Sequence, residues 1–238
     1  MQKKILLFFY CFGLIAQTID TCCGPITIDE PVLLDLIESW PVQRMKKLHS
    51  DGLSHCLGRC IGDSRFDNAM RTLAILRLTG APIVQQIETL LSDVSHTAFS
   101  EAGNYLFRLG PDRSYRTVIH RWFLERTGLL TLLEKHDIPL DSLHWNSIHE
   151  SIDISPQSLY LAQAIRRAID IRALSMSDLY WGGEEEVWLT LHAIRDEVVQ
   201  DLLALINQLI DGEGPADADD ALGEGGAVAA VDGEPGSA

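Results

Sequence analysis

Residues 90–100 have the sequence LLSDVSHTAFS, in which Asp93 and His96 are the side chains best able to bind a ligand or transfer a proton. In a helix their spacing of three residues would bring both onto one face. Asp93 is also well suited to cap a helix, and His96 could equally be a core histidine bonded to backbone carbonyls. The segment therefore marks either a chemical site or a capped helix end, and the flanking sequence has to distinguish the two.

On both sides of this segment, apolar residues recur at helical spacing. Asp29 before Pro31 and Ser155 before Pro156 mark helix starts, with proline in the first turn. Helices are expected at residues 31–37, 42–49, 67–79, 83–91, 93–107, 115–126, 129–136 and 155–174, with one long amphipathic helix at 184–210. The pattern predicts an all-α fold, a compact multi-helix bundle that ends in this long helix and a disordered tail.

The chain divides into four expected regions. Residues 1–17 are signal-peptide-like, 18–175 form the main helical domain, 176–210 form a C-terminal helical extension, and 211–238 form an acidic tail rich in Gly and Ala. The tail contains almost no large apolar residue, so burial cannot offset the entropy lost on ordering it. The three consecutive glutamates that begin at Glu184 are expected to be a solvated helix start, where acids favour the helix dipole.

Charge limits the partners that the protein can have. The 238 residues carry a net charge of -15, and 46% of them are hydrophobic, enough to bury a substantial single core. Eight of the acids lie in the tail, which has no Lys or Arg, so the remainder has a net charge of -7. A mildly acidic body lacks the basic stripe that phosphate backbones require, which argues against polymeric nucleic acid as a partner. A single nucleotide needs only one or two local cations.

The N-terminus has the features of an export signal. Lys3 and Lys4 precede an apolar run over residues 5–16. This run is too short to cross a bilayer comfortably, so no stable membrane span is expected. If it acts as a signal, the protein is exported or periplasmic. If it is instead an N-terminal strand or buried helix, the protein is cytoplasmic, and both localisations stay open.

The cysteines offer no strong motif. Removal of a leader would leave four of them, an even number that could form disulfides in an oxidising compartment. Cys56 and Cys60, with His49 and His55, also make a candidate zinc set. No paired CxxC or HxxxH spacing supports zinc, so buried or disulfide-bonded cysteines are the favoured interpretation.

Three segments together resemble the HD family of metal-dependent phosphohydrolases, in particular the branch that is similar to dGTP triphosphohydrolases. The first is SRFDN at residues 64–68, similar to the Arg-Phe/Tyr-Glu-His opening of a family helix. The second is residues 90–100, and the third is residues 115–128, similar to the segment that carries a later catalytic histidine. The resemblance covers residues 24–174 and implies an HD-like helical domain there.

In that family a histidine, a His-Asp pair and a later aspartate converge on one or two metal ions, which polarise phosphate and activate water. The resemblance places these four ligands at Asn68, Ser92, Asp93 and Gln163. Asp93 alone keeps the family's residue type. One carboxylate with two amides and a hydroxyl is a poor site for a divalent ion, whose binding depends on ligand charge and type.

The resemblance also implies three residues outside the metal shell. His96 and His120 match catalytic histidines, and Arg65 matches the arginine that precedes the first ligand. Such groups supply proton transfer and neutralise charge in the transition state. Glu101 and Arg121 depart from the family pattern, because they replace a histidine and an acid. Both histidines could equally be core residues, and Arg65 could pair with a neighbouring aspartate.

These assignments predict an HD-superfamily homologue that is catalytically impaired and has a nucleotide-binding or regulatory role. No cofactor is expected, and Mn, Fe or Mg is implied if activity remains. One alternative is an active metal-dependent phosphohydrolase acting on nucleoside phosphates, and another is an exported helical interaction protein. A nucleoside phosphate is the candidate ligand, and the family implies a homo-oligomer.

Overall fold

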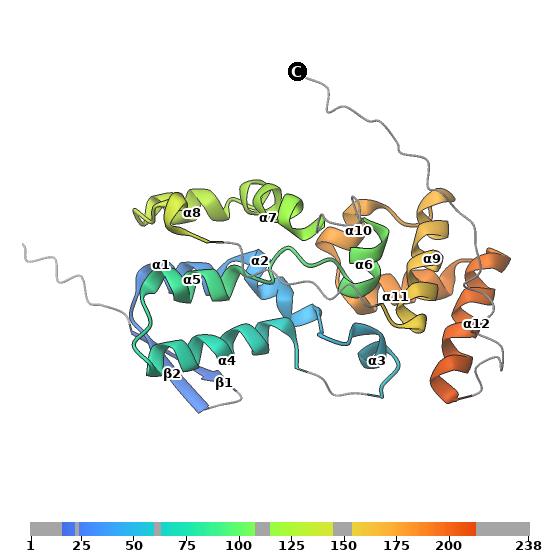
Figure 1. The fold of residues 1–238 in the computed structure, drawn as a ribbon, viewed down its shortest axis with the longest axis horizontal. Helices are drawn as coiled ribbons and strands as arrows, with labels where there is room; N and C mark the ends of the chain where they lie inside the picture. Colours follow the sequence, from blue (N-terminus) through green and yellow to red (C-terminus); the bar gives the residue numbers. More distant parts are fainter. Residues whose placement is uncertain (1–15, 22–23, 60–62, 108–114, 145–153, 213–238) are drawn as a thin grey trace, which may run out of the picture.

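The computed structural model of the protein describes residues 16–21, 24–59, 63–107, 115–144 and 154–212. Within these ranges the chain forms helices and one two-stranded sheet (Figure 1). The all-α bundle expected from the sequence is therefore confirmed. The predicted leader, apart from its last residues, and the acidic tail beyond residue 212 lie outside the described residues. No helix in the described part of the chain is long and apolar enough to cross a membrane.

The first described element is an antiparallel hairpin of β1 (Gln17–Thr21) and β2 (Gly24–Ile28), in which Gln17 pairs with Ile28. Ile28 is fully buried, while Ile19 and Ile26 pack partly buried against the core. The hairpin thus attaches the start of the described chain to the helical body, at the blue end of the ribbon in Figure 1.

The helices follow in short succession, and several begin with side-chain caps. Ser64 and Asp67 form a capping box, and Ser155 caps a helix that has Pro156 in its first turn, as the sequence predicts. The bounds are α1 (Pro31–Glu38), α2 (Trp40–Arg44), the 3-10 helix η1 (Met45–Lys47), α3 (Gly52–Cys56), α4 (Arg65–Leu78), α5 (Ile83–Leu91), α6 (Ser100–Leu106), α7 (Tyr115–Arg126), α8 (Leu129–Lys135), the 3-10 helix η2 (Leu140–Ser142), α9 (Pro156–Asp170), α10 (Met176–Trp181), α11 (Glu184–Ala193) and α12 (Glu197–Asp211).

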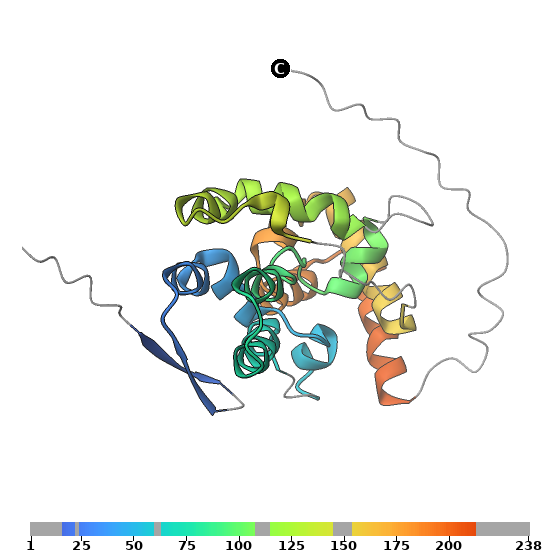
Figure 2. The ribbon, with the colours of Figure 1, turned by 60° about the vertical axis from the view of Figure 1, so that its left-hand side comes forward.

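Two hydrophobic clusters form the core. The first is built mainly by α1, α2, α4, α5, α7 and α8, and the second by α3, α6 and α9–α12. Residues 90–100 pass from one to the other, because Leu90 and Val94 belong to the first cluster and Ala98 and Phe99 to the second. Figure 2, turned by 60°, shows the same helices from another side. The segment singled out in the sequence therefore lies at the junction of the two clusters.

The helix predicted at residues 93–107 is wrong over its first part. Residues 92–99 form a loop, and α6 begins only at Ser100. Phe99 has a φ of 55°, in the left-handed region, which a right-handed helix cannot contain. The backbone N–H of Ala98 donates to the carbonyl of Leu179 at 2.9 Å. A tertiary hydrogen bond and this turn thus override the local helical spacing.

The single helix predicted at 184–210 is also wrong, because residues 194–196 interrupt it. Asp196 has extended backbone angles, and its side chain accepts from the N–H of Val199, so a new helix starts there. The interruption changes the buried face of α12 to Val199, Leu203 and Ile206, whereas Val198 is half exposed. At the other end of the chain, Asp29 caps no helix and accepts from Arg77 instead.

Candidate functional site

Arg65, at the first position of α4, links the two ends of the 92–99 loop. Its Nη1 lies 3.1 Å from Oδ2 of Asp93, and its Nη2 donates to Oγ of Ser100 at 2.7 Å. The Arg65 and Asp93 side chains are 13% and 27% exposed, so this ion pair is partly shielded from water. Shielding strengthens a charge-assisted bond. Arg65 thus pairs with the aspartate that the resemblance identifies, and not with its sequence neighbours Asp63 or Asp67 in the contacts that the structure defines.

His96 lies beside the other oxygen of Asp93, with 3.4 Å between Nε2 and Oδ1. It is 4% exposed. Its backbone carbonyl accepts from Nη1 of Arg44 at 2.9 Å, which anchors this part of the loop to α2. The two residues quoted first from the sequence are therefore in contact, although they lie in a loop and not on a helix face.

His120, on α7, is 1% exposed and reaches the same loop through Ser95, with 2.9 Å between Nδ1 and the Ser95 hydroxyl. Since Ser95 is also fully buried, this contact braces the loop from inside the core. His120 thus contacts the loop that carries Asp93 and His96 through Ser95, and it is buried as a core histidine would be. Its catalytic role stays a prediction.

Three of the four implied ligand positions line one cleft of about 550 Å³. Asn68, Ser92 and Asp93 lie there together with Glu88 and His144, among others. The amide of Asn68 donates to Ser50 at 2.9 Å and accepts from Arg71 at 3.0 Å, while the Ser92 hydroxyl donates to the Thr89 carbonyl at 2.9 Å. The structure thus brings together the positions that the resemblance selects at α4 and at the end of α5.

Gln163 is the exception. It is exposed on α9 and is not among the residues that line this cleft. The register of the resemblance at α9 therefore has no support from the contacts of this side chain, and its assignment as a former ligand stays a prediction.

The donor set at the three implied ligand positions of the cleft does not fit a divalent ion. The side chains at the implied positions are an amide, a hydroxyl and one carboxylate, and that carboxylate already pairs with Arg65. Among the residues that the structure describes, no three His, Cys, Asp or Glu side chains are grouped so that they could hold a metal. Divalent metal sites depend on several charged or imidazole ligands. No reaction step through a metal is derived from this geometry.

The cysteine–histidine set is arranged differently from a zinc site. His49 and His55 stack with ring centroids 3.4 Å apart. Cys60 lies outside the described residues. Burial, together with Glu184 and Glu185, raises the pKa of the Cys56 thiol to about 12. Among the described residues, no three His, Cys, Asp or Glu side chains that include His49, His55 or Cys56 are placed to hold a metal ion.

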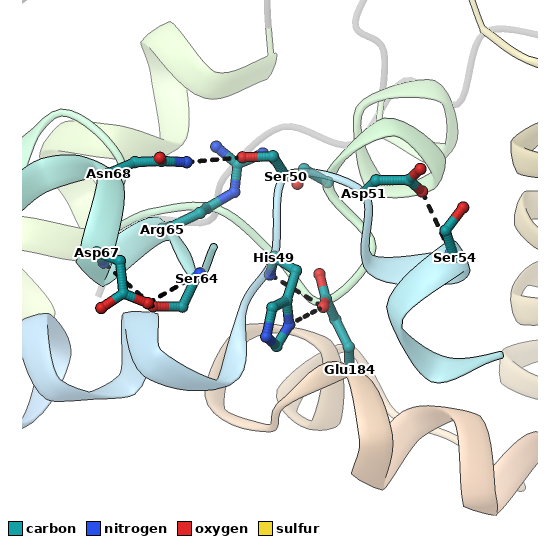
Figure 3. A network of polar contacts seen from close by, with 10 residues as sticks. His49, Ser50, Asp51, Ser54, Ser64, Arg65, Asp67, Asn68 and Glu184 are labelled. Atoms are coloured by element: carbon teal, nitrogen blue, oxygen red, sulfur yellow. Dashed lines mark hydrogen bonds and ion pairs between the residues drawn. The ribbon is translucent and has the colours of Figure 1, made fainter. Parts of the chain in front are cut away.

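Figure 3 shows a polar network that sequence analysis missed, centred on Glu184 at the start of α11. Glu184 is 1% exposed, and its Oε2 accepts from the backbone N–H of His49 at 3.0 Å and lies 3.0 Å from His49 Nδ1. Burial raises the pKa of Glu184 to about 7, against the opposing effects of the His49 N–H and the Arg65 guanidinium. The expected solvated helix start is therefore wrong for Glu184, and no local signal separates it from the two glutamates that follow.

The contacts of Glu184 and the contacts of the Asp93 cleft meet at the turn before α3. His49 contacts Glu184, and the next residue, Ser50, accepts from Asn68 of the cleft. The Arg65 guanidinium also acts electrostatically on Glu184. The turn at residues 48–51 thus connects α11 with the implied ligand position at Asn68.

Comparison with known proteins agrees with the resemblance at a coarse level. No family model matches the chain. The chain is 28% identical over 162 residues to the metal-dependent phosphohydrolase cns2 of Cordyceps militaris, a match that covers 67% of this chain and 47% of that protein. It is 31% identical over 112 residues to the uncharacterized protein YdhJ of Bacillus subtilis, covering 47% of this chain and 34% of that protein.

The chain thus spans about half of the length of one curated relative and about a third of the other. Homology to a protein named as a metal-dependent phosphohydrolase supports an HD-type phosphohydrolase scaffold. It also suggests that a divalent metal belongs to this kind of scaffold, whereas the donor set of the described cleft does not fit one.

Proposed function

We propose that this protein is a homologue of the HD phosphohydrolases, from the branch similar to dGTP triphosphohydrolases, that binds a ligand in the Asp93 cleft without metal-dependent hydrolysis. The observation that carries the proposal is the ion pair between Arg65 and Asp93. A regulatory or scaffolding role follows, because a site that binds without turnover can act only through occupancy.

The charge balance of the cleft supports this proposal. A carboxylate that is largely shielded from water needs a cation or several hydrogen-bond donors. In a metal site the ion supplies that charge, whereas here the guanidinium of Arg65 supplies it at 3.1 Å. A divalent ion at Asp93 would compete with this pair, and the other two implied ligand positions in the cleft supply only the Asn68 amide and the Ser92 hydroxyl.

A nucleoside phosphate is the ligand class that we propose, on the strength of the resemblance. Small-molecule sites are commonly clefts of roughly 300–1,000 Å³, and the cleft beside Asp93 measures about 550 Å³. Asn68, Thr72 and Gln85 offer amides and a hydroxyl that can bind a base or sugar. Arg71, which donates to Asn68 and also pairs with Asp63, is the cation that we propose for binding a phosphate group.

Metal content and phosphate release test the proposal together. The full chain is purified from cells supplied with Mn, Fe and Mg, analysed for metals, and assayed with nucleoside mono-, di- and triphosphates. We expect far less than one metal ion per chain and phosphate release no faster than for Asp93→Ala. Stoichiometric metal, with activity that disappears in Asp93→Ala, would overturn the proposal.

The reverse experiment puts the family's ligands back at the implied positions and asks whether metal binding returns. Asn68→His combined with Ser92→His returns two imidazoles to the cleft beside Asp93, and Gln163→Asp can be added to examine the position on α9. Gain of Mn or Fe binding in the first combination would support the assignment of these two positions. If only the variant with Gln163→Asp gains metal, the register of the resemblance at α9 is supported as well.

The second candidate is an active metal-dependent phosphohydrolase acting on nucleoside phosphates. The observation that favours it is the homology to a protein named for that activity. His96 and His120 would then take acid–base roles, since both adjoin the loop that carries Asp93. Activity in the same assay that depends on His96 and on added metal would favour this candidate.

A further inference from the structure

Helices α10 and α11 contact the 92–99 loop, which carries Asp93 and His96. Leu179 of α10 accepts from the N–H of Ala98, and the Phe99 ring packs edge-on against Trp188 of α11, with centroids 6.3 Å apart. Arg44 donates to the carbonyls of His96, Leu179 and Gly182, so one guanidinium joins the loop to α10 and to the α10–α11 connection. The shape of the loop therefore depends on how α10 and α11 are docked.

Glu184 is the acidic side chain at the centre of this docking. A Cβ atom on Gly52 would overlap its carboxyl group, so the first turn of α3 closes directly over it. Oε2 is held by His49, while Oε1 is buried and makes no hydrogen bond of ordinary geometry among the described residues, although the backbone N–H of Phe99 faces the carboxyl group. The carboxyl group is thus enclosed and only partly compensated by donors, which disfavours its charged form.

The groups that face Glu184 come from several elements. The 48–51 turn supplies His49, α3 supplies His55 and Cys56, and α4 supplies Arg65. The loop adds the backbone N–H of Phe99, and Asp67 of α4 acts on His49. Arg65 already donates to the Asp93 carboxylate and to the Ser100 hydroxyl, so its charge acts on Asp93 as well as on Glu184.

We infer that Glu184 is a positioning residue of the Asp93 cleft: its enclosed carboxyl group holds α11 against the 48–51 turn and the 92–99 loop, and a negative charge in this enclosure loosens both. The inference rests on the proposed function only in taking this cleft as the binding site. Through Ser50 the loosening reaches Asn68, and through the loop it reaches His96.

The sign of the pH effect follows from the direction of the shifts. Burial raises the pKa of Glu184 from 4.5 to about 7, so its contribution is complete below 4.5 and is lost as the pH rises through 7. Burial also lowers the pKa of His49 from 6.5, which has the opposite effect and destabilises the cluster as the solution becomes acidic. Loosening as the pH rises is therefore attributable to Glu184.

Hydrogen exchange in the full chain, corrected for intrinsic rates, measures this loosening between pH 5 and 8.5. If opening exposes Glu184, the opening constant of residues 94–100 rises by up to about tenfold per pH unit until about pH 7, then levels off. Glu184→Gln keeps the shape but cannot ionise, so its opening constant should not change with pH. Glu185→Gln, at the neighbouring position on α11, should follow the natural protein.

Residues 199–206 of α12 serve as an internal reference. A merely structural role for Glu184 would change exchange in α12 and in the loop alike, whereas a positioning role changes the loop preferentially. Carboxyl NMR of Glu184 gives a second measurement that does not depend on variant folding. An ordinary titration of Glu184 near pH 4.5, or the same pH profile in Glu184→Gln as in the natural protein, would overturn the inference. Neither outcome depends on whether the cleft binds metal or hydrolyses phosphate.

Discussion

The Arg65 guanidinium lies 3.1 Å from the Asp93 carboxylate, although the two residues are 28 positions apart in the chain, and both side chains are partly shielded from water. The pair joins the start of α4 to the loop after α5, two of the three places where the resemblance puts metal ligands. Arg65 therefore neutralises the Asp93 carboxylate, which would otherwise be the charged ligand for a metal ion.

Removing one partner of the Arg65–Asp93 pair should destabilise the protein more than expected from the loss seen when both are removed. Arg65→Met and Asp93→Asn each leave one group without its ionic partner, and we expect each to lower the free energy of unfolding by about 1–3 kcal/mol. In the double variant the losses should not add, with a coupling of roughly 1 kcal/mol or more. Urea unfolding of the four proteins measures this cycle.

A matched control is the exposed pair between Arg121 and Glu125 on α7, whose side chains are 79% and 53% exposed. Pairs of that kind contribute about 0.3–0.5 kcal/mol. Additive losses at Arg65 and Asp93, no larger than those at the control pair, would mean that the cleft carboxylate does not depend on Arg65.

Substitution of Arg44 should lower the free energy of unfolding strongly. It is 3% exposed and donates to three backbone carbonyls, of His96, Leu179 and Gly182. Arg44→Met removes the donor to the His96 and Gly182 carbonyls, at about 1–3 kcal/mol for each group left unsatisfied, whereas the Leu179 carbonyl still accepts from Ala98. Arg44→Lys should be intermediate, because an ammonium lacks the planar fork that spans separate acceptors. Equal stability of the two variants, measured by urea unfolding, would contradict this explanation.

Gly52 is predicted to be required by the Glu184 carboxyl group and not by its backbone conformation. Gly52→Ala places a methyl group against Glu184, and overpacking of this kind costs about 1–3 kcal/mol. In a Glu184→Ala background the same substitution should be nearly neutral, since the obstructing atoms are gone. Thermal unfolding of the two pairs of proteins measures the difference, and an equal cost in both backgrounds would refute the steric explanation.

Local signals in the sequence predicted much of this fold because they act within a single turn. The Ser155 cap with Pro156, and the amphipathic residues 83–91, specify α9 and α5 through neighbouring residues alone. The loop at 92–99 could not be predicted in that way. Its backbone is fixed by Leu179 and Arg44, which are distant in sequence, and the left-handed conformation of Phe99 depends on those contacts.

The site was predicted in part for a related reason. The family spacing located Asn68, Ser92 and Asp93, which do line one cleft, because order and spacing along α4 and α5 carry over between homologues. It gave no indication of Glu184, since burial of one glutamate out of three depends on the close approach of Gly52 from another helix. Helical periodicity predicts which residues share one face of a helix, but it does not predict which other element packs on that face.

Asp196 should determine where α12 begins. Its carboxylate accepts from the N–H of Val199 and receives two nitrogens of Arg167 on α9, at 2.7 and 3.1 Å from the nearest oxygens. Asp196→Asn keeps an oxygen for the cap but loses the charge, while Asp196→Ala loses both. The melting temperature should therefore fall further in Asp196→Ala than in Asp196→Asn.

The same residue gives a pH signature that separates the two contributions. Hydrogen bonds from Arg167 hold the pKa of Asp196 below its usual value of 3.8, so its contribution is present above pH 3.8 and is lost as the pH falls through the lowered value. The difference in melting temperature between the natural protein and Asp196→Asn should accordingly shrink in acid. A difference that stays constant down to about pH 2.5 would mean that it does not come from the charge pairing between Asp196 and Arg167.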